Sequence, residues 1–186
     1  MVAYACMNRI DLSKVFDLFM HQGLHVSNPK FCNNDTLNKK GAVFVVRNKS
    51  DFSGAGVKGF IVTTKQTLLE QAHKLSHFTP NIYRKFGYTD AARKKIKGFE
   101  ERNLLQINTF AVDIDTKRYS VNELLLVCID DSVGEPTLIL QTTRGYQIFF
   151  ILATPIYISN NKNYLSLTVA KRIADNLKRS LVHVEA

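Results

Sequence analysis

The chain alternates between short runs with the character of β-strands and longer segments with helical periodicity. Five runs are rich in β-branched and aromatic residues and are bounded by turn residues, and they cover 41–47, 58–64, 108–114, 137–141 and 146–152. Four other segments space their apolar residues as an amphipathic helix does, and they cover 12–19, 67–75, 120–130 and 165–181. This order predicts an α+β protein in which helices pack on a partly antiparallel sheet.

Local signals fix the ends of several of these elements. Asp11 or Ser13 is placed to cap the first helix. Ser120 and Glu123 form an S-x-x-E capping box that opens the third helix. The turn at 142–145 joins two strands into a predicted hairpin. The last helix has apolar residues at every fourth position, which predicts that this row faces the core: Leu165, Val169, Ile173, Leu177 and Leu181.

Composition narrows the class of protein. The chain has 186 residues, of which 45% are hydrophobic and 22% charged, as expected for one globular domain, 1–186. The longest apolar stretch, 148–158, is too short to span a bilayer, so no membrane partner is expected. The three cysteines form no C-x-x-C motif, which favours reduced thiols in a cytoplasmic protein over a disulfide scaffold or a zinc ribbon.

The positive charge is concentrated in the first part of the chain. The net charge is +9, and the whole excess lies within residues 1–110. It peaks in 84–102, whose candidate nucleic-acid-binding residues are Arg84, Lys85, Arg93, Lys94, Lys95 and Lys97. Aromatic residues interleave with these cations, namely Phe78, Tyr83, Phe86, Tyr88 and Phe99. Cations that follow phosphates beside rings that stack on bases favour single-stranded nucleic acid. A solvated basic loop over the core is the alternative.

Two carboxylates stand at the end of an apolar run. Asp113 and Asp115 follow Phe110-Ala111-Val112, and residues two apart in a strand face the same side, roughly 6–7 Å apart at the backbone. Unpaired carboxylates so placed repel each other, and a divalent cation such as Mg²⁺ relieves the repulsion. The alternative is a strand end with two solvated acids, helped by Lys117 and Arg118.

A second candidate site lies in the turn between the last two strands. Arg144 suits a phosphate or a carboxylate, and Gly145 allows a backbone to approach a ligand closely. An ordinary hairpin turn is the alternative.

Segments 77–117 and 136–152 together resemble the archaeo-eukaryotic primase superfamily. More closely, they resemble the primase-like N-terminal region of replication proteins on plasmids and mobile elements of Gram-positive bacteria. The resemblance covers about 77–182 and is carried by the patterns TPN-Y, QIN-F-VDID and RGYQ-FF. It divides the chain into an N-terminal part (1–76), a basic aromatic insert (77–107) and a catalytic part (108–182) with an RRM-like core.

The resemblance also implies a chemistry. Asp113 and Asp115 would be catalytic and would bind Mg²⁺ or Mn²⁺. Arg144, Gly145 and Gln147 would contact the phosphates of a nucleoside triphosphate. The basic insert would hold a single-stranded DNA template or origin DNA. Such an enzyme makes primers by two-metal nucleotidyl transfer.

The sequence departs from that pattern in two places. Gln147 stands where this superfamily often has His, and the third acidic motif is represented at best by Glu185. We therefore expect a fragment of a longer protein that binds DNA but makes primers poorly. A non-catalytic DNA-binding replication initiator domain is the alternative function. An RRM-like RNA-binding protein is a third and less favoured hypothesis, because the aromatic RNP1 pattern is missing.

Overall fold

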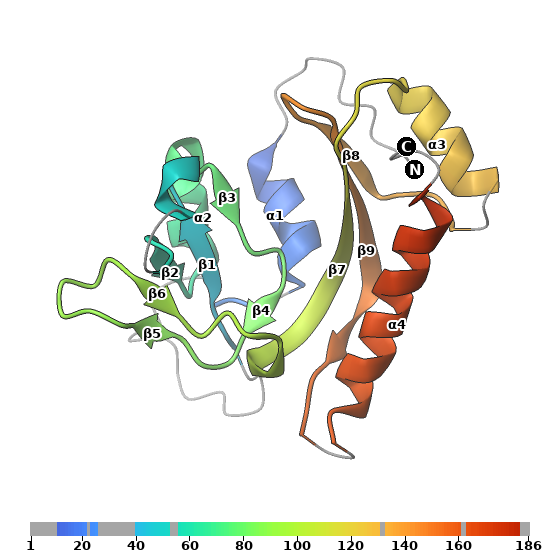
Figure 1. The fold of residues 1–186 in the computed structure, drawn as a ribbon. Helices are drawn as coiled ribbons and strands as arrows, with labels where there is room; N and C mark the ends of the chain where they lie inside the picture. The colour runs from blue at the N-terminus through green and yellow to red at the C-terminus, as the bar shows by residue number, and fades with distance from the viewer. Residues whose placement is uncertain are drawn as a thin grey trace. The chain divides into compact units, whose positions relative to one another are not determined.

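The structure, a computed structural model, describes residues 11–21, 23–25, 40–52, 56–130, 133–160 and 163–182. Figure 1 shows the fold. The described α-helices are α1 (Leu12–Met20), α2 (Lys65–Gln71), α3 (Val121–Asp130) and α4 (Leu165–Ser180). The described strands are β1 (Val43–Val46), β2 (Phe60–Val62), β3 (His77–Phe78), β4 (Ile82–Tyr83), β5 (Gly87–Tyr88), β6 (Ile96–Lys97), β7 (Leu104–Ile114), β8 (Leu138–Gln141) and β9 (Tyr146–Tyr157). Short 3₁₀ turns occupy Lys49–Phe52, Ala72–Lys74 and Glu101–Asn103.

The strands form three sheets and confirm the predicted α+β class. The strand orders are β2-β1-β3, β4-β7-β9-β8 and β5-β6. The hairpin β8–β9 is antiparallel, as predicted, as are β1–β2, β1–β3, β4–β7 and β5–β6. Among the described helices, none combines the length and apolar character needed to cross a membrane. Cys6, Cys32 and the polar stretch around 27–35 lie outside the described residues.

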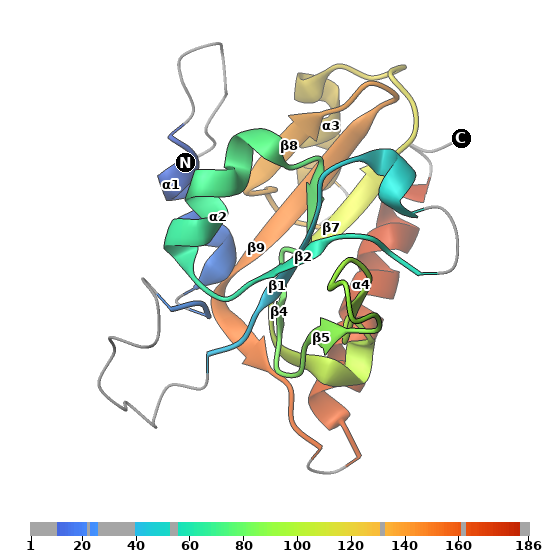
Figure 2. The same ribbon diagram turned by 90° about the vertical axis from the view of Figure 1, so that its left-hand side faces the viewer.

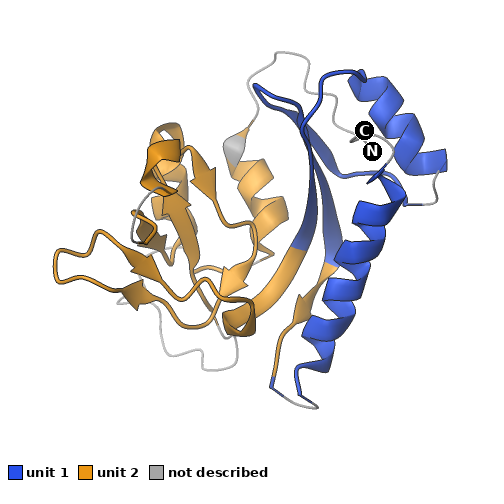
Figure 3. Ribbon diagram, viewed as in Figure 1, with its two compact units in different colours: residues 1–8, 109–153, 160–186 blue, residues 9–108, 154–159 orange. Residues whose placement is uncertain are grey.

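The chain divides into two compact units (Figure 3). Among the described residues, unit 1 comprises Thr109–Ala153 and the segment from Asn160 to Val182. Unit 2 comprises the residues up to Asn108 together with Thr154–Ser159. Strands β7 and β9 contribute residues to both units.

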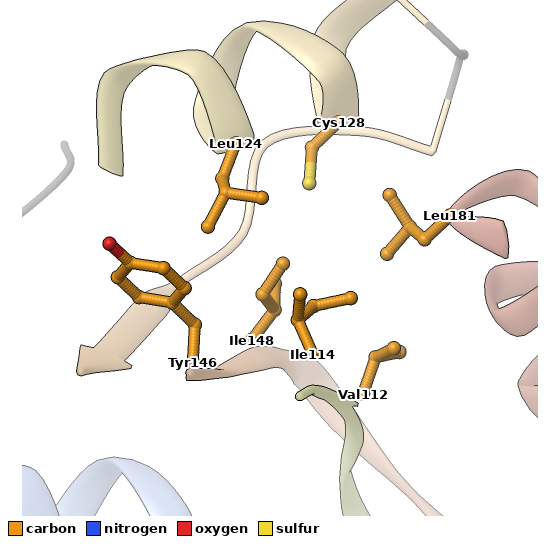
Figure 4. Packing of buried hydrophobic residues seen from close by; sticks show 7 residues of the cluster. All are labelled: Val112, Ile114, Leu124, Cys128, Tyr146, Ile148 and Leu181. Carbon is orange, nitrogen blue, oxygen red and sulfur yellow. The ribbon is translucent and has the colours of Figure 1, made fainter. Parts of the chain in front are cut away.

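In unit 1, one face of β7 and β9 is covered by helices. Residues of β7 alternate between buried and exposed from Phe110 to Ile114, and Tyr146 and Ile148 are the buried residues at the start of β9. Figure 4 shows the resulting core, which α3 and the end of α4 close: Val112, Ile114, Leu124, Cys128, Tyr146, Ile148 and Leu181. Cys128 is fully buried in this core. By alternation, Asp113 and Gln147 lie on the opposite face of these two strands.

The predicted capping box is present at the start of α3. The Ser120 amide donates to Glu123 Oε2 at 2.6 Å, and the Glu123 amide donates to Ser120 Oγ at 3.2 Å. The two hydrogen bonds satisfy amides that have no partner within the helix. The bonds from Ser120 also hold the pKa of the Glu123 carboxyl below its ordinary value.

Replacing Ser120 with Ala should lower the free energy of unfolding by about 1 kcal/mol. That change corresponds to roughly 2–4 °C in melting temperature for a chain of this size. Because the Glu123 pKa is lowered in the folded state, its share of the stabilisation is present at neutral pH. It fades as the pH falls below about 4.3, the ordinary value of a glutamate. Urea unfolding at both pH values measures this, Ser120→Thr is the control that keeps the hydroxyl, and equal stability of Ser120→Ala and wild type would contradict it.

The last helix forms as predicted, but the predicted core row is wrong over most of its length. Leu165, Val169 and Ile173 are exposed, at 51%, 46% and 36%. The buried positions of α4 and the residue after it are Leu167, Ala170 and Leu181. The reason is geometric: residues four apart drift by about 40° at each step around an α-helix. A row of five such positions winds across the surface, and only its last members reach the core.

In unit 2, an aromatic cluster links the first helix to the first sheet. The ring of Phe78 meets Phe16 and Phe19 edge to face, with centroids 5.4 and 5.8 Å apart. On the same sheet, Phe44 contacts Tyr83 and Phe99 in the same manner. Figure 2 shows β1, β2 and α2 of unit 2, with the left-hand side of Figure 1 turned toward the viewer.

A buried polar network in unit 2 accounts for two of the sequence patterns noted above. Gln106 and Asn108 are buried in β7, and Gln106 Nε2 donates to Asn108 Oδ1 at 2.7 Å. The Asn108 amide donates to Asn81 Oδ1 at 2.8 Å, and Asn108 Nδ2 donates to the Pro80 carbonyl at 3.5 Å. Thr79 Oγ1 accepts from the Phe44 amide at 3.0 Å. The QIN pattern therefore holds the TPN segment in place.

Several element ends differ from the sequence prediction. Strand β7 begins at Leu104 rather than at residue 108, and β9 continues to Tyr157 rather than ending at 152. Hydrogen bonds explain the extra length, since the Ile158 amide donates to the Leu105 carbonyl at 2.9 Å. The basic segment 77–107 contains the two-residue strands β3 to β6 and the start of β7, joined by turns.

Candidate functional site

The two predicted acidic residues lie at the end of β7 in unit 1. Asp113 is exposed, on the opposite side of the strand from buried Val112 and Ile114. Asp115 follows the last residue of the strand, and its side chain is 72% exposed. Both carboxylates are therefore accessible to a ligand from solvent.

The predicted turn between β8 and β9 lies directly against this strand end. A Cβ placed on Gly145 would overlap the Ile114 carbonyl oxygen and lie 2.8 Å from the Thr116 amide nitrogen. Only glycine allows this approach. The turn is closed by two hydrogen bonds, from the Gly145 amide to Thr142 Oγ1 at 3.0 Å and from the Thr142 amide to the Gly145 carbonyl at 2.8 Å. Gly145 thus fixes the turn beside the acidic residues, as a backbone contact.

Arg144 projects from that turn to one of the acids. Its Nη2 lies 3.3 Å from Asp115 Oδ1, and the two side chains are 69% and 72% exposed. An ion pair this exposed contributes little to stability, of the order of 0–1 kcal/mol. It does show that Arg144 reaches the carboxylate, although 28 residues separate the two in the chain.

Gln147 belongs to the same face of the sheet as Asp113. Its neighbours Tyr146 and Ile148 are buried on the helix-covered face, so alternation places Gln147 on the other face, where it is partly exposed. It pairs with Leu140 of β8. Unit 1 therefore brings together Asp115, Arg144 and Gly145, and it places Asp113 and Gln147 on one adjacent surface.

These residues fit a divalent cation only in part. Carboxylate oxygens are the ligands that Mg²⁺ prefers, and Mg²⁺ is commonly held by one or two carboxylates together with substrate phosphates. Within the described ranges, no group of three or more His, Cys, Asp or Glu side chains is arranged to hold a metal. The donor set therefore suits a cation whose coordination is completed by a phosphate, rather than an all-protein metal site.

Arg84, the first of the predicted nucleic-acid-binding residues, has a structural partner set. Its Nε and Nη2 donate to the Leu104 carbonyl at 3.1 and 2.7 Å, and Nη2 also donates to the Ile158 carbonyl. The side chain is half-buried. The guanidinium therefore ties the start of β7 to the residue after β9, and a structural role explains it.

The other five predicted cations lie on or beside the hairpin of β5 and β6, which projects from the rest of unit 2 (Figure 1). Lys95 is partly buried, and the other four are exposed: Lys85, Arg93, Lys94 and Lys97. The Asp90 carboxylate accepts from the Lys95 amide at 2.7 Å and from the Lys94 amide at 3.0 Å. These bonds, the one from Lys95 first, hold the pKa of Asp90 below its ordinary value. The hairpin tip is thus a fixed turn.

Most of the predicted stacking rings have partners inside unit 2. Phe78, Tyr83 and Phe99 make the aromatic contacts described above. Tyr88 receives the Arg93 guanidinium 5.6 Å from its ring centroid, and its hydroxyl accepts from the Ile61 amide at 3.3 Å. Phe86 is 44% exposed. Phe99 is also 42% exposed, so two of the five predicted rings, Phe86 and Phe99, remain accessible from solvent.

One cation near the hairpin was not identified from the sequence. Lys58 forms an antiparallel bridge with Lys95, which brings it beside the basic segment. In the sequence it belongs to a separate predicted strand, 37 residues before Lys95. Only the long-range pairing reveals it.

Three known proteins are similar to this chain. The chain is 38% identical to a replication initiation protein of Bacillus anthracis over 146 residues, and this matched region covers 78% of the chain. Over 143 residues it is 36% identical to protein RepS of Streptococcus pyogenes and to protein RepR of Streptococcus agalactiae. No protein-family model matches, and no solved structure matches. The matched regions cover at least 75% of this chain. They cover 28% of the length of each of the three proteins.

Proposed function

We propose that this chain is the primase-like part of a replication initiation protein encoded by a plasmid or a mobile element. It would carry out nucleotidyl transfer that makes primers on single-stranded DNA in the bacterial cytoplasm. The single observation that supports the chemistry is the convergence of Asp115, Arg144 and Gly145 at the end of β7. The similarity to a replication initiation protein supports the biological role.

Each residue has a role in this proposal. Asp113 and Asp115 would hold Mg²⁺ or Mn²⁺, which would supply positive charge and lower the pKa of an attacking hydroxyl. Arg144 would bind a phosphate of the incoming nucleoside triphosphate. Its present partner, the exposed Asp115 carboxylate, would bind the metal ion instead and would release the guanidinium. Gln147 would donate a neutral hydrogen bond from the sheet face that carries Asp113.

We also propose the RRM-like architecture for the catalytic part. The order β7-α3-β8-β9-α4 has helices on one face of the sheet in unit 1, and the candidate site residues Asp113 and Gln147 lie on the other face. Nucleotide and template would bind on the face that carries Asp113 and Gln147.

A DNA-binding initiator domain without chemistry is the second candidate. The observation that favours it is that the described residues provide two acids at the site and no third metal-ligating side chain. It predicts DNA binding that does not depend on Asp113 or Asp115. The two candidates therefore differ in whether the acids bind a metal together with a nucleotide.

A nucleoside triphosphate with Mn²⁺ should raise the melting temperature of the wild-type chain. At a hundredfold excess over the dissociation constant the stabilisation is about 2.7 kcal/mol, which corresponds to roughly 5–11 °C. Asp113→Asn and Asp115→Asn should remove the shift, because the carboxylates hold the metal that bridges to the phosphates. Differential scanning fluorimetry measures it.

Asp175→Asn is the matched control, since Asp175 is an exposed acid on α4 in the same unit. It should keep the full shift. A wild-type chain that binds DNA but shows no shift with nucleotide and metal would support the non-catalytic initiator instead. Primer synthesis on a single-stranded template, measured on the same proteins, should depend on both acids.

A further inference from the structure

A three-stranded ribbon in unit 2 places basic side chains on one face. The segment before β2 pairs with β6, since the Gly59 amide donates to the Lys94 carbonyl at 2.9 Å and the Ile96 amide donates to the Val57 carbonyl at 3.0 Å. In this pattern Lys58 and Lys95 are directly opposite each other without hydrogen bonds between them. Their side chains therefore emerge on the same face, at the closer of the two cross-strand spacings.

The same face continues along β6. Ile96 is buried and pairs with Tyr88, whose hydroxyl accepts from the Ile61 amide, so these two side chains face inward. By alternation, Lys95 and Lys97 face outward. Lys97 is opposite Gly87, where a Cβ would lie 3.3 Å from Lys97 Cε. We call the outward set Lys58, Lys95 and Lys97 the lysine face.

Arg47 adds a further cation beside this face. Its guanidinium lies 5.0 Å from the ring centroid of Phe60, which stands two residues beyond Lys58. The ring is thus covered by a cation. Tyr88 faces inward, and Phe99 packs edge to face on Phe44 with 42% of its surface exposed.

The lysine face carries a like-charge pair with little compensation. Lys58 and Lys95 oppose each other, and like charges directly opposite in a sheet are destabilising. Two acids lie near this pair. The Asp90 carboxylate accepts from the Lys95 amide, and Asp51, whose carbonyl accepts from the Lys58 amide, has its carboxylate bound by the Asn48 amide. Among the described residues, none of the three lysines is in a salt bridge. A bound polyanion would neutralise the repulsion between Lys58 and Lys95, which explains why the pair is present.

We infer that the lysine face binds the phosphate backbone of duplex DNA, without reading bases. Single-strand binding gains much of its affinity from bases stacked on aromatic side chains. The rings nearest to this face already have partners, Phe60 with Arg47 and Phe99 in part with Phe44. A face that acts by charge alone favours the duplex, which carries about one charge per 1.7 Å of axis against one per 3.4 Å for each strand. The choice of DNA rests on the proposed role in replication, whereas the nucleotide site plays no part in it.

The test compares Lys58→Ala/Lys95→Ala with Lys14→Ala/Lys74→Ala, two exposed lysines on α1 and the 3₁₀ turn Ala72–Lys74. Fluorescence anisotropy with a duplex and a single strand of equal length, without nucleotide or divalent metal, gives the affinities over a salt series. The wild type and the control pair should prefer the duplex. The lysine-face pair should lose about tenfold in duplex affinity, and its log–log salt slope should fall by up to about 1.8.

A second measurement separates binding from structure. Because the substitution removes a like-charge pair, the melting temperature of Lys58→Ala/Lys95→Ala should equal or exceed that of the wild type. Unchanged duplex binding, or preference of the wild type for the single strand, would overturn the inference, as would a lower melting temperature that accounts for the lost affinity. Failure here leaves the effect of nucleotide and Mn²⁺ on melting intact, so the two proposals are tested separately.

Discussion

Replacing Asn108 with Asp should lower the free energy of unfolding by about 4 kcal/mol near neutral pH, or roughly 8–16 °C in melting temperature. Asn108 is fully buried in β7, where its Nδ2 faces the Pro80 carbonyl and its Oδ1 accepts from Gln106. The substitution turns the donor into a second oxygen facing a carbonyl oxygen. A carboxylate there is both desolvated and repelled.

The size of the effect is set by the free energy needed to keep the buried carboxyl of the Asn108→Asp variant protonated at neutral pH. A protonated carboxyl can donate to the Pro80 carbonyl and restores the pattern of the amide. Keeping it protonated costs about 1.4 kcal/mol for each pH unit above the ordinary aspartate pKa of about 3.9. Its folded-state pKa is therefore raised, so the loss is small near pH 4, grows as the pH rises and levels off above the folded-state pKa.

Urea unfolding of Asn108→Asp at several pH values measures this dependence. Asn122→Asp is the matched control, because Asn122 is exposed in the first turn of α3, where a negative charge is slightly favourable. That variant should match or slightly exceed the wild type at neutral pH. If Asn108→Asp followed the pH profile of the wild type, the buried network would not have the role described.

Local signals in the sequence predicted much of unit 1. The capping box at Ser120 and the hairpin of β8 and β9 depend on residues close together in the chain, and both are confirmed. The buried network in β7 was harder to predict, because Gln106 and Asn108 are polar residues that long-range partners satisfy. Because of these polar residues, the apolar pattern predicts that β7 begins at residue 108, whereas the strand begins at Leu104.

The errors in the fold have a common physical origin. The row at Leu165, Val169 and Ile173 is amphipathic by spacing, but which side of a helix is buried depends on the tilt at which it meets the sheet. The strands β3 to β6 are two residues each. Strands β3 and β4 pair with β1 and β7, and β5 and β6 pair with each other. Such short strands carry no periodic pattern.

The candidate site also combines features that the sequence predicts with features that depend on long-range pairing. The sequence identified Asp115 and Arg144 as separate candidates, and the structure places them 3.3 Å apart through the contact between Gly145 and β7. In contrast, Lys58 was missed because its relation to Lys95 depends on strand pairing. The chemistry of these residues can be predicted from their types, whereas their proximity is a property of the folded sheet.

Gly145→Ala should lower the free energy of unfolding by at least about 3 kcal/mol, or roughly 6–12 °C in melting temperature. The added Cβ would overlap the Ile114 carbonyl oxygen and press on the Thr116 amide, and both are backbone atoms at the end of β7. Backbone cannot rotate away as a side chain can, so the turn and the strand must separate. Separation would also move Arg144 away from Asp115 and remove the response of melting to nucleotide and Mn²⁺.

Gly87→Ala is the matched control for this prediction. A Cβ at Gly87 meets only the Lys97 side chain, whose nearest atom, Cε, is the flexible end of a lysine. That variant should have a melting temperature at or above the wild-type value, because alanine restricts the unfolded chain more than glycine. Thermal unfolding followed by circular dichroism compares the two. If Gly145→Ala melted like Gly87→Ala, the turn would not be held against β7, and the proposed joint action of Arg144 with Asp115 would lose its structural basis.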